Sequence, residues 1–207
     1  MKFKLNLFLL LAIVLIPFSV KAQTINVSNE TLLKAYLSTG GDLKLTSNIT
    51  LTSNIDVNVD SVIDLNGYTI NTGNYSITSY AALNVKDTSD DSNGKITGTS
   101  NYIIKVGSSS EKGNLILDSG NIDCSAKSYC VQVYSKGTLT LNDGKISAVD
   151  FPLVVTGEVI INGGIVEANK GVIYGNTNAL ITLNDGLIKF KVLSTTDTDI
   201  VPKTKHL

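Results

Sequence analysis

Apolar and polar positions along this chain fall into a short line that recurs with small changes. Inside each line, apolar residues alternate with polar ones, as in TLTL at 138–141, and this period of two is typical of a half-buried strand. A turn, usually with Asn or Asp before a glycine, interrupts the strand, and the alternation then resumes. The aligned lines are VIDLNGYTI (62–70), LILDSGNIDC (115–124), LTLNDGKISA (139–148), VIINGGIVEA (159–168) and ITLNDGLIKF (181–190), with a looser line at 83–98.

The spacing of the turn glycines predicts the architecture. Glycines 67, 94, 120, 144, 164 and 186 are separated by 27, 26, 24, 20 and 22 residues, which is the range of a solenoid or array. A second apolar run follows most lines, for example CVQVY at 130–134, so a unit holds three short strands and no helical period. Helical repeats are therefore disfavoured, and a propeller blade needs about 40 residues or more. Sequential hairpins do not explain why equivalent residues recur at one unit's length.

We therefore predict an all-β solenoid, a single-stranded parallel β-helix with about 22–27 residues per coil and about 4.8 Å between coils. The lines repeat because one coil cannot bury its apolar face without matching neighbours. The predicted interior rows are Leu117, Leu141, Ile161 and Leu183; Ile122, Ile146, Val166 and Ile188; and Cys124, Ala148, Ala168 and Phe190. The residues expected to face water beside them are Thr140, Lys145 and Ser147. Amide side chains that stack at the turn can hydrogen-bond up the solenoid, and this predicted turn ladder is Asp118, Asn142, Asn162 and Asn184.

The segments before and after the repeats have other predicted roles. Residues 1–22 have a basic start, an apolar run and a small-residue end, which is the pattern of a cleaved signal peptide. Residues 23–42 contain a predicted capping helix, with Ser28 or Asn29 as its N-cap, an apolar face and Gly40 at its end. The β-helix is expected over 43–193, and 194–207 is a polar tail that offers no clear second lid. We therefore expect that the tail folds over the last coil, that two copies of the chain meet there, or that the protein is prone to association. The residues of the helix's apolar face are Leu32, Leu33, Tyr36 and Leu37.

Composition and charge limit the classes of function that the chain can have. All 17 basic residues are lysines, and without residues 1–22 the net charge is near -4. A chain without arginine and without a basic face is not expected to bind nucleic acid. We predict no cofactor, no transmembrane span after signal removal and a secreted or cell-surface location.

The lines DLNGYTI (64–70), VKDTSDDSNGKITG (85–98) and LTLNDGKI (139–146) resemble a known group. They are similar to right-handed parallel β-helix proteins of the pectate-lyase-like superfamily, and more closely to secreted repeat proteins of low-GC and gut bacteria. The resemblance spans 28–190 and implies a right-handed solenoid with a carbohydrate-binding or adhesin-like role. Because lyases, hydrolases, adhesins and spacers share this fold, the fold alone does not assign an activity.

The sequence offers few candidate catalytic residues. The resemblance to pectate lyases implies an arginine base, which is absent, and the polygalacturonase-like relatives imply a histidine, whereas His206 lies beyond the last coil. Paired carboxylates can hydrolyse glycosides without either residue. The pairs on offer are Asp90 with Asp91, and Asp143 with Asp185, all at turns where solvated carboxylates are ordinary.

Three further sets of residues are candidates for binding or cross-linking. Ser89, Asp91 and Asn93 form a weak candidate calcium turn, since Ser100 stands where a bidentate glutamate is expected. Cys124 and Cys130 either form a disulfide or leave a core thiol, and the spacing does not decide between them. Tyrosines near strand ends are candidate sugar platforms or ordinary packing residues. They are Tyr68, Tyr102, Tyr134 and Tyr174.

These observations favour a secreted or surface-exposed, non-catalytic module that binds glycans or proteins in the manner of an adhesin. A polysaccharide lyase or glycoside hydrolase is the first alternative. A structural spacer or a fragment of a larger adhesin is the second.

Overall fold

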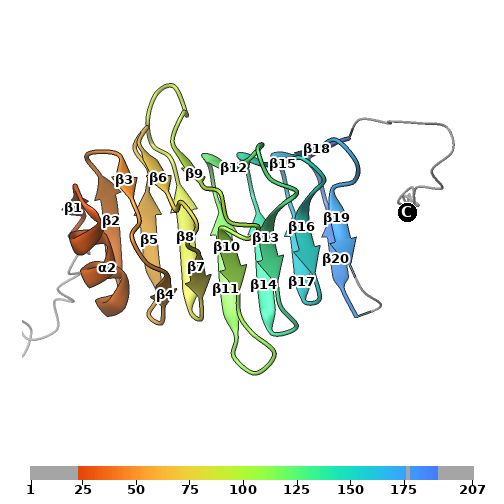
Figure 1. The fold of residues 1–207 in the computed structure, drawn as a ribbon, viewed down its shortest axis with the longest axis horizontal. Coiled ribbons are helices and arrows are strands. Elements are labelled where there is room, and N and C mark those ends of the chain that lie inside the picture. The colour runs from red at the N-terminus through yellow and green to blue at the C-terminus, as the bar shows by residue number, and fades with distance from the viewer. Residues whose placement is uncertain (1–22, 176–177, 191–207) are drawn as a thin grey trace, which may run out of the picture.

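The computed structural model describes residues 23–175 and 178–190, and it is a right-handed parallel β-solenoid of about seven turns with one short helix (Figure 1). Every strand pairing in the described chain is parallel, and each coil contributes strands to up to three sheets. The predicted signal peptide and the polar tail lie outside the described residues.

The strands fall into three sheets that form the sides of the solenoid. The eight-stranded sheet contains β1 (Ile25–Val27), β2 (Gly41–Leu45), β5 (Ser61–Asp64), β8 (Ala82–Lys86), β11 (Gly113–Leu117), β14 (Gly137–Leu141), β17 (Glu158–Ile161) and β20 (Leu180–Leu183). The seven-stranded sheet contains β3 (Ile49–Thr50), β6 (Thr69–Asn71), β9 (Lys95–Thr97), β12 (Asn121–Cys124), β15 (Lys145–Ala148), β18 (Ile165–Ala168) and β21 (Leu187–Phe190). The six-stranded sheet contains β4 (Ile55–Val57), β7 (Ile77–Ser79), β10 (Ile104–Val106), β13 (Tyr129–Val133), β16 (Phe151–Val155) and β19 (Ile173–Gly175).

The register of the strands follows the aligned sequence lines. Leu141 pairs with Leu117 on one side and Ile161 on the other, and Ile161 pairs with Leu183. Ile146 likewise pairs with Ile122 and Val166. These side chains are buried except at the last coil, so the alternation of the sequence places one continuous core inside the three sheets.

One residue on the outer face departs from the expectation. Thr140 and Lys145 are half-buried, but only 8% of Ser147 is exposed, so the prediction that it faces water is wrong. Its hydroxyl lies 3.3 Å from Asp123 Oδ1, and its strand neighbours are Asp123 and Glu167. The side chain points outward, but the longer side chains on both adjacent strands cover it.

The N-terminal end of the solenoid is covered by helix α2 (Glu30–Thr39). Asn29 is the N-cap, since its side chain accepts a hydrogen bond from the Leu32 amide, and Gly40 ends the helix with a φ of 81°. Leu33 and Leu37 are fully buried, and the helix contacts β2 and β4. The segment before the helix differs from the expectation, because β1 already pairs with β2 as a strand of the solenoid.

Candidate binding groove on the seven-stranded sheet

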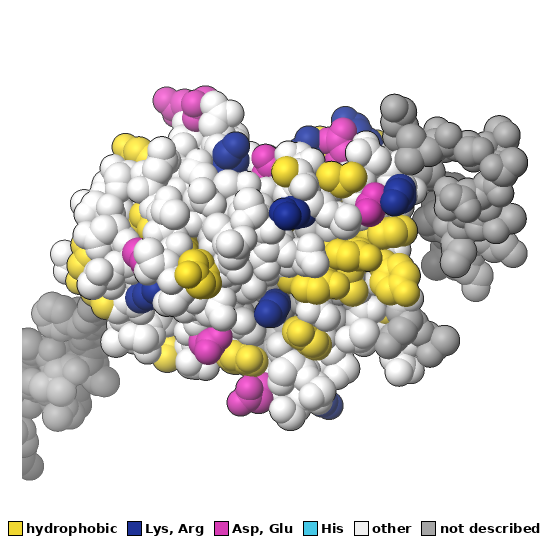
Figure 2. Space-filling model, in the orientation of Figure 1, with side chains coloured by type: hydrophobic (Ala, Val, Ile, Leu, Met, Phe, Trp, Pro, Cys, Tyr) yellow, Lys and Arg dark blue, Asp and Glu magenta, His cyan; other side chains and the backbone are white. Residues whose placement is uncertain are grey.

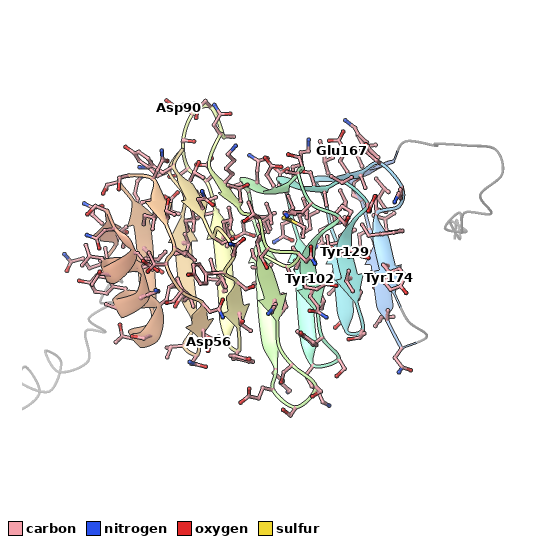
Figure 3. All side chains as sticks on the ribbon, in the orientation of Figure 1. Asp56, Asp90, Tyr102, Tyr129, Glu167 and Tyr174 are labelled. Carbon is pink, nitrogen blue, oxygen red and sulfur yellow. A yellow bond between two sulfur atoms is a disulfide. The ribbon has the colours of Figure 1, made fainter. Side chains whose placement is uncertain are left out.

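The outer face of the seven-stranded sheet carries rows of polar side chains. Parallel strands in register place outward residues of successive coils one above another, about 4.8 Å apart. One row is Lys95, Asn121 and Lys145, and the row beside it is Thr97, Asp123, Ser147, Glu167 and Lys189. Figure 3 shows Glu167 at the upper rim of the molecule, and Figure 2 shows charged side chains gathered along that rim.

Hydrogen bonds and ion pairs hold this face in place. Lys145 Nζ lies 2.5 Å from Glu167 Oε2, and Lys95 Nζ lies 3.9 Å from Asp123 Oδ2. Asn121 Nδ2 donates to the backbone oxygens of Ser92 and Gly94 at 3.1 and 3.2 Å. Since each of these side chains has a partner within the face, the arrangement is formed before any ligand arrives.

A groove of about 440 Å³ runs over this face. Its walls offer carboxylates, ammonium groups, amides and hydroxyls within a span of four coils, or roughly 14 Å of strand spacing. The lining residues include Lys95, Asn121, Asp123, Lys145, Ser147 and Glu167. Such a groove presents both donors and acceptors along one direction.

The two carboxyls of the groove are both held in the ionised form. Burial by itself raises the pKa of Asp123, but hydrogen bonds from Ser125 and Ser147 and the charge of Lys95 outweigh it, so this pKa lies below its ordinary value. The hydrogen bond from Lys145 lowers the pKa of Glu167. Glycoside hydrolysis needs one carboxyl that stays protonated as the acid, and neither of these groups meets that requirement at neutral pH.

The carboxylates at the turns, considered as a catalytic pair from the sequence, take part in turn structure. Asp143 Oδ1 accepts from the Gly144 amide and Asp185 Oδ1 from the Gly186 amide, each at 2.7 Å. The two turns are separated by the turn at Gly164. Asp90 is exposed and lies at the tip of the expanded loop at the top of Figure 3.

The candidate calcium turn is tied together by its own hydrogen bonds. The Asp91 carboxylate accepts from Asn93 Nδ2 at 2.7 Å, and hydrogen bonds with Asn93 and Ser89 lower the pKa of Asp91. The organising group is Asp87, which sequence reasoning missed: it accepts from the amides of Gly67 and Gly94 and from the Ser89 hydroxyl. Within the described residues no group of three His, Cys, Asp or Glu side chains could hold a metal ion.

The predicted turn ladder is present in the hydrogen-bond pattern. Asn142 Nδ2 donates to Asp118 Oδ1 at 2.7 Å, Asn162 Nδ2 to Asn142 Oδ1 at 2.9 Å, and Asn184 Nδ2 to Asn162 Oδ1 at 2.7 Å. The ladder extends one coil further toward the N-terminus, where Asn84 Nδ2 donates to Asp118 Oδ2. These bonds join the side chains of successive coils.

The tyrosines proposed as sugar platforms separate into different places. Tyr102 and Tyr174 belong to an aromatic stack on the six-stranded side, whose middle members, Tyr129 and Phe151, sequence reasoning missed (Figure 3). Ring centroids of Tyr102 and Tyr129 are 5.6 Å apart at an interplanar angle of 23°, and those of Tyr129 and Phe151 are 6.5 Å apart at 18°. Rings stacked this way cover each other's faces, which are the surfaces a sugar needs.

The remaining tyrosines add little to a sugar platform. Tyr174, tilted 60° to Phe151 and 60% exposed, is the ring of the stack with the most open surface. Tyr68 packs against the core, and Tyr134 follows directly after β13 and is half-buried. The four tyrosines therefore do not form one surface.

Cys124 and Cys130 form a disulfide at the corner between β12 and β13. Their Cα atoms are 5.4 Å apart, and both residues are buried. The bridged corner carries Ser125, whose amide donates to Asp123, and Tyr129 of the aromatic stack. The disulfide thus lies between the groove and the stack and fixes residues of both.

A second, larger groove of about 640 Å³ lies along the eight-stranded sheet. Glycine, alanine and threonine form much of its lining, and Glu158 is its one carboxylate among the described residues. Lys112 and Lys136 are on its rim and exposed.

No protein-family model matches this chain, and no curated protein and no solved structure matches it. The parallel solenoid is shown by its own geometry, while membership of the pectate-lyase-like superfamily stays a prediction. Within the described part of the chain, no helix has the length and apolar character needed to span a membrane.

Proposed function

We propose that the protein is a secreted or surface-exposed binding module, adhesin-like and non-catalytic, whose groove on the seven-stranded sheet binds a carbohydrate chain. The single observation that carries the proposal is the pair of adjacent polar rows, which offer hydrogen-bond donors and acceptors on strands β9, β12 and β15 and a carboxylate on β18. A sugar chain likewise presents hydroxyl donors and acceptors at a regular repeat. The location rests on the signal-like pattern of residues 1–22.

The charge balance of the groove favours a neutral glycan. Lys95 and Lys145 are each close to a carboxylate, so a polyanion gains little from them and meets the negative charges of Asp123 and Glu167. A neutral chain can hydrogen-bond to the edges of these pairs without breaking them.

Binding without turnover is favoured over catalysis by the same carboxyls. Asp123 and Glu167 are two strands apart, so their backbones are separated by about 9–10 Å. The pKa values of both carboxyls lie below their ordinary values. A carboxyl that must donate a proton at neutral pH needs a raised pKa. The enzyme alternative therefore requires a proton donor other than these two groups.

A glycan array followed by affinity measurement tests the proposal. The purified protein is compared with Asn121→Ala and Glu167→Gln, and with Thr140→Ala on the outer face of the eight-stranded sheet as the matched control. We expect neutral glycans to bind, each groove variant to weaken binding at least tenfold, and the control to bind like the parent. Unchanged binding in both groove variants, or reproducible cleavage of the bound glycan, would refute the proposal.

A further inference from the structure

The C-terminal end of the solenoid exposes residues that belong to the core. Ile181 and Leu183 are 38% and 45% exposed, whereas Val159 and Ile161, their partners on the preceding strand, are 0% and 1% exposed. Leu180 and Leu187 are also exposed, but they lie in outward-facing rows, in register with Glu158 and Ile165. The inward-facing residues Ile181 and Leu183 form the end patch, which is the open cross-section of the hydrophobic interior.

The strands at this end also have an unpaired edge. β19, β20 and β21 each stand last in their sheets within the described chain, so each hydrogen-bonds to a neighbouring strand on one side only. At the opposite end β1, β3 and β4 likewise stand at the ends of their sheets, but helix α2 covers the core there with the buried side chains of Leu33 and Leu37. An open strand edge with apolar side chains favours pairing with another chain.

The sequence beyond β21 does not continue the core in register. Gly164 and Gly186 are 22 residues apart, and the same step from Ile181 and Leu183 leads to Lys203 and Lys205. Lysines are almost never fully buried without a partner. A further coil of this chain in the same register would therefore place charges over the apolar patch.

We propose that two copies of the chain join end to end through the end patch, about a two-fold axis, with β20 antiparallel to the same strand of the second copy. A cover for this end must offer apolar side chains at its centre and strand edges around them, and a second copy presents both. Head-to-tail stacking is blocked by α2, so the contact closes as a dimer and does not extend into a fibre. In a two-fold arrangement the facing strands run antiparallel, which preserves their hydrogen bonding.

Sedimentation velocity of the purified full chain over a wide concentration range tests the proposal. We expect a reversible dimer whose dissociation constant rises at least tenfold in Leu183→Lys. Thr182→Lys lies on the same strand with an outward side chain and serves as the matched control, in which the dimer persists. Circular dichroism melts check that each variant is folded. Because 45% of Leu183 is exposed, we expect the monomer to tolerate the change.

Three results would overturn the proposal. The chain could remain monomeric throughout the concentration range, or the dimer could be equally strong in Leu183→Lys. Assemblies that grow without limit as concentration rises would exclude a closed two-fold contact. If Leu183→Lys is unfolded, Ile181→Lys is measured in its place against the same control.

Discussion

Gly144 illustrates how stacking restricts a single residue. Its φ is 88°, and a Cβ placed there would lie 2.2 Å from the backbone oxygen of Gly120 in the preceding coil. Gly73 also has a positive φ, 56°, but a Cβ added there would meet no other atom within 4 Å. The first glycine is required by both conformation and space, and the second by conformation alone.

Alanine substitutions at these two glycines separate the two effects. Gly73→Ala should lower the free energy of unfolding by roughly 1 kcal/mol through backbone strain. Gly144→Ala should lower it by at least about 3 kcal/mol, because the backbone of the neighbouring coil must also move. Urea unfolding of both variants measures the difference, and equal losses would contradict the close stacking of the turns.

At this scale the sequence indicates some roles and conceals others. The inward row and the Asn142 ladder follow from alternation and from aligned turns, because both depend only on position within a coil. Tyr129 and Phe151 could not be placed together in the same way, since the corners vary in length and shift residues relative to the strands. A signal was nevertheless present: both residues lie two positions before the aligned Val131 and Leu153.

At the scale of the element, strand β14 shows how the core and the outer face differ. Leu141 is buried between Leu117 and Ile161, while Thr140 points outward on the same strand. Asn142 follows directly and bonds to both neighbouring coils. Substitutions at these three neighbouring positions should therefore lower the free energy of unfolding by different amounts.

Alanine substitutions along this segment should rank accordingly. Leu141→Ala should cost roughly 2 to 5 kcal/mol by leaving a cavity, and Thr140→Ala should fall within about 0.5 kcal/mol. Asn142→Ala should lie between them, because it interrupts the turn ladder. Denaturant melts measure the order, and a larger loss for Thr140→Ala than for Leu141→Ala would contradict the stacked-coil structure.

Helix α2 is fastened to the solenoid through Glu30. Its carboxylate accepts from the Thr52 amide and hydroxyl, each at 2.7 Å, and pairs with Lys34. Burial opposes ionisation of this group, but these hydrogen bonds and the Lys34 charge prevail and lower the pKa from 4.5 to about 2. The contact therefore stabilises the folded chain when Glu30 is charged.

Acid titration of stability tests this contact. A lowered carboxyl pKa adds stability that is fully present above about pH 4.5 and is lost as the pH falls toward 2. We expect Glu30→Gln to reduce the free energy of unfolding at pH 7 by roughly 1 to 2 kcal/mol, after allowing for solvent screening. The parent and the variant should converge near pH 2; a constant difference from pH 7 to pH 2 would exclude this role for Glu30.

At the scale of the whole molecule, the repeat that builds the core also builds the groove. Alternation places apolar residues inside, and the same register aligns Asn121 with Lys145, and Asp123 with Ser147, on the outside. The sequence predicted the solenoid because inward positions repeat in kind. It did not single out the groove, because outward residues differ from coil to coil and their pairing depends on which side chains reach one another.

The most direct test of the central claim maps a bound glycan by NMR. Isotope-labelled protein is titrated with an oligosaccharide from the glycan selected on the array, and backbone amide shifts are followed. We predict that the largest changes cluster on β9, β12, β15 and β18, around Asn121, Ser147 and Glu167, while β11, β14 and β17 change little. Saturable binding with its largest changes on the eight-stranded sheet, or on the aromatic stack, would contradict the groove as the binding site.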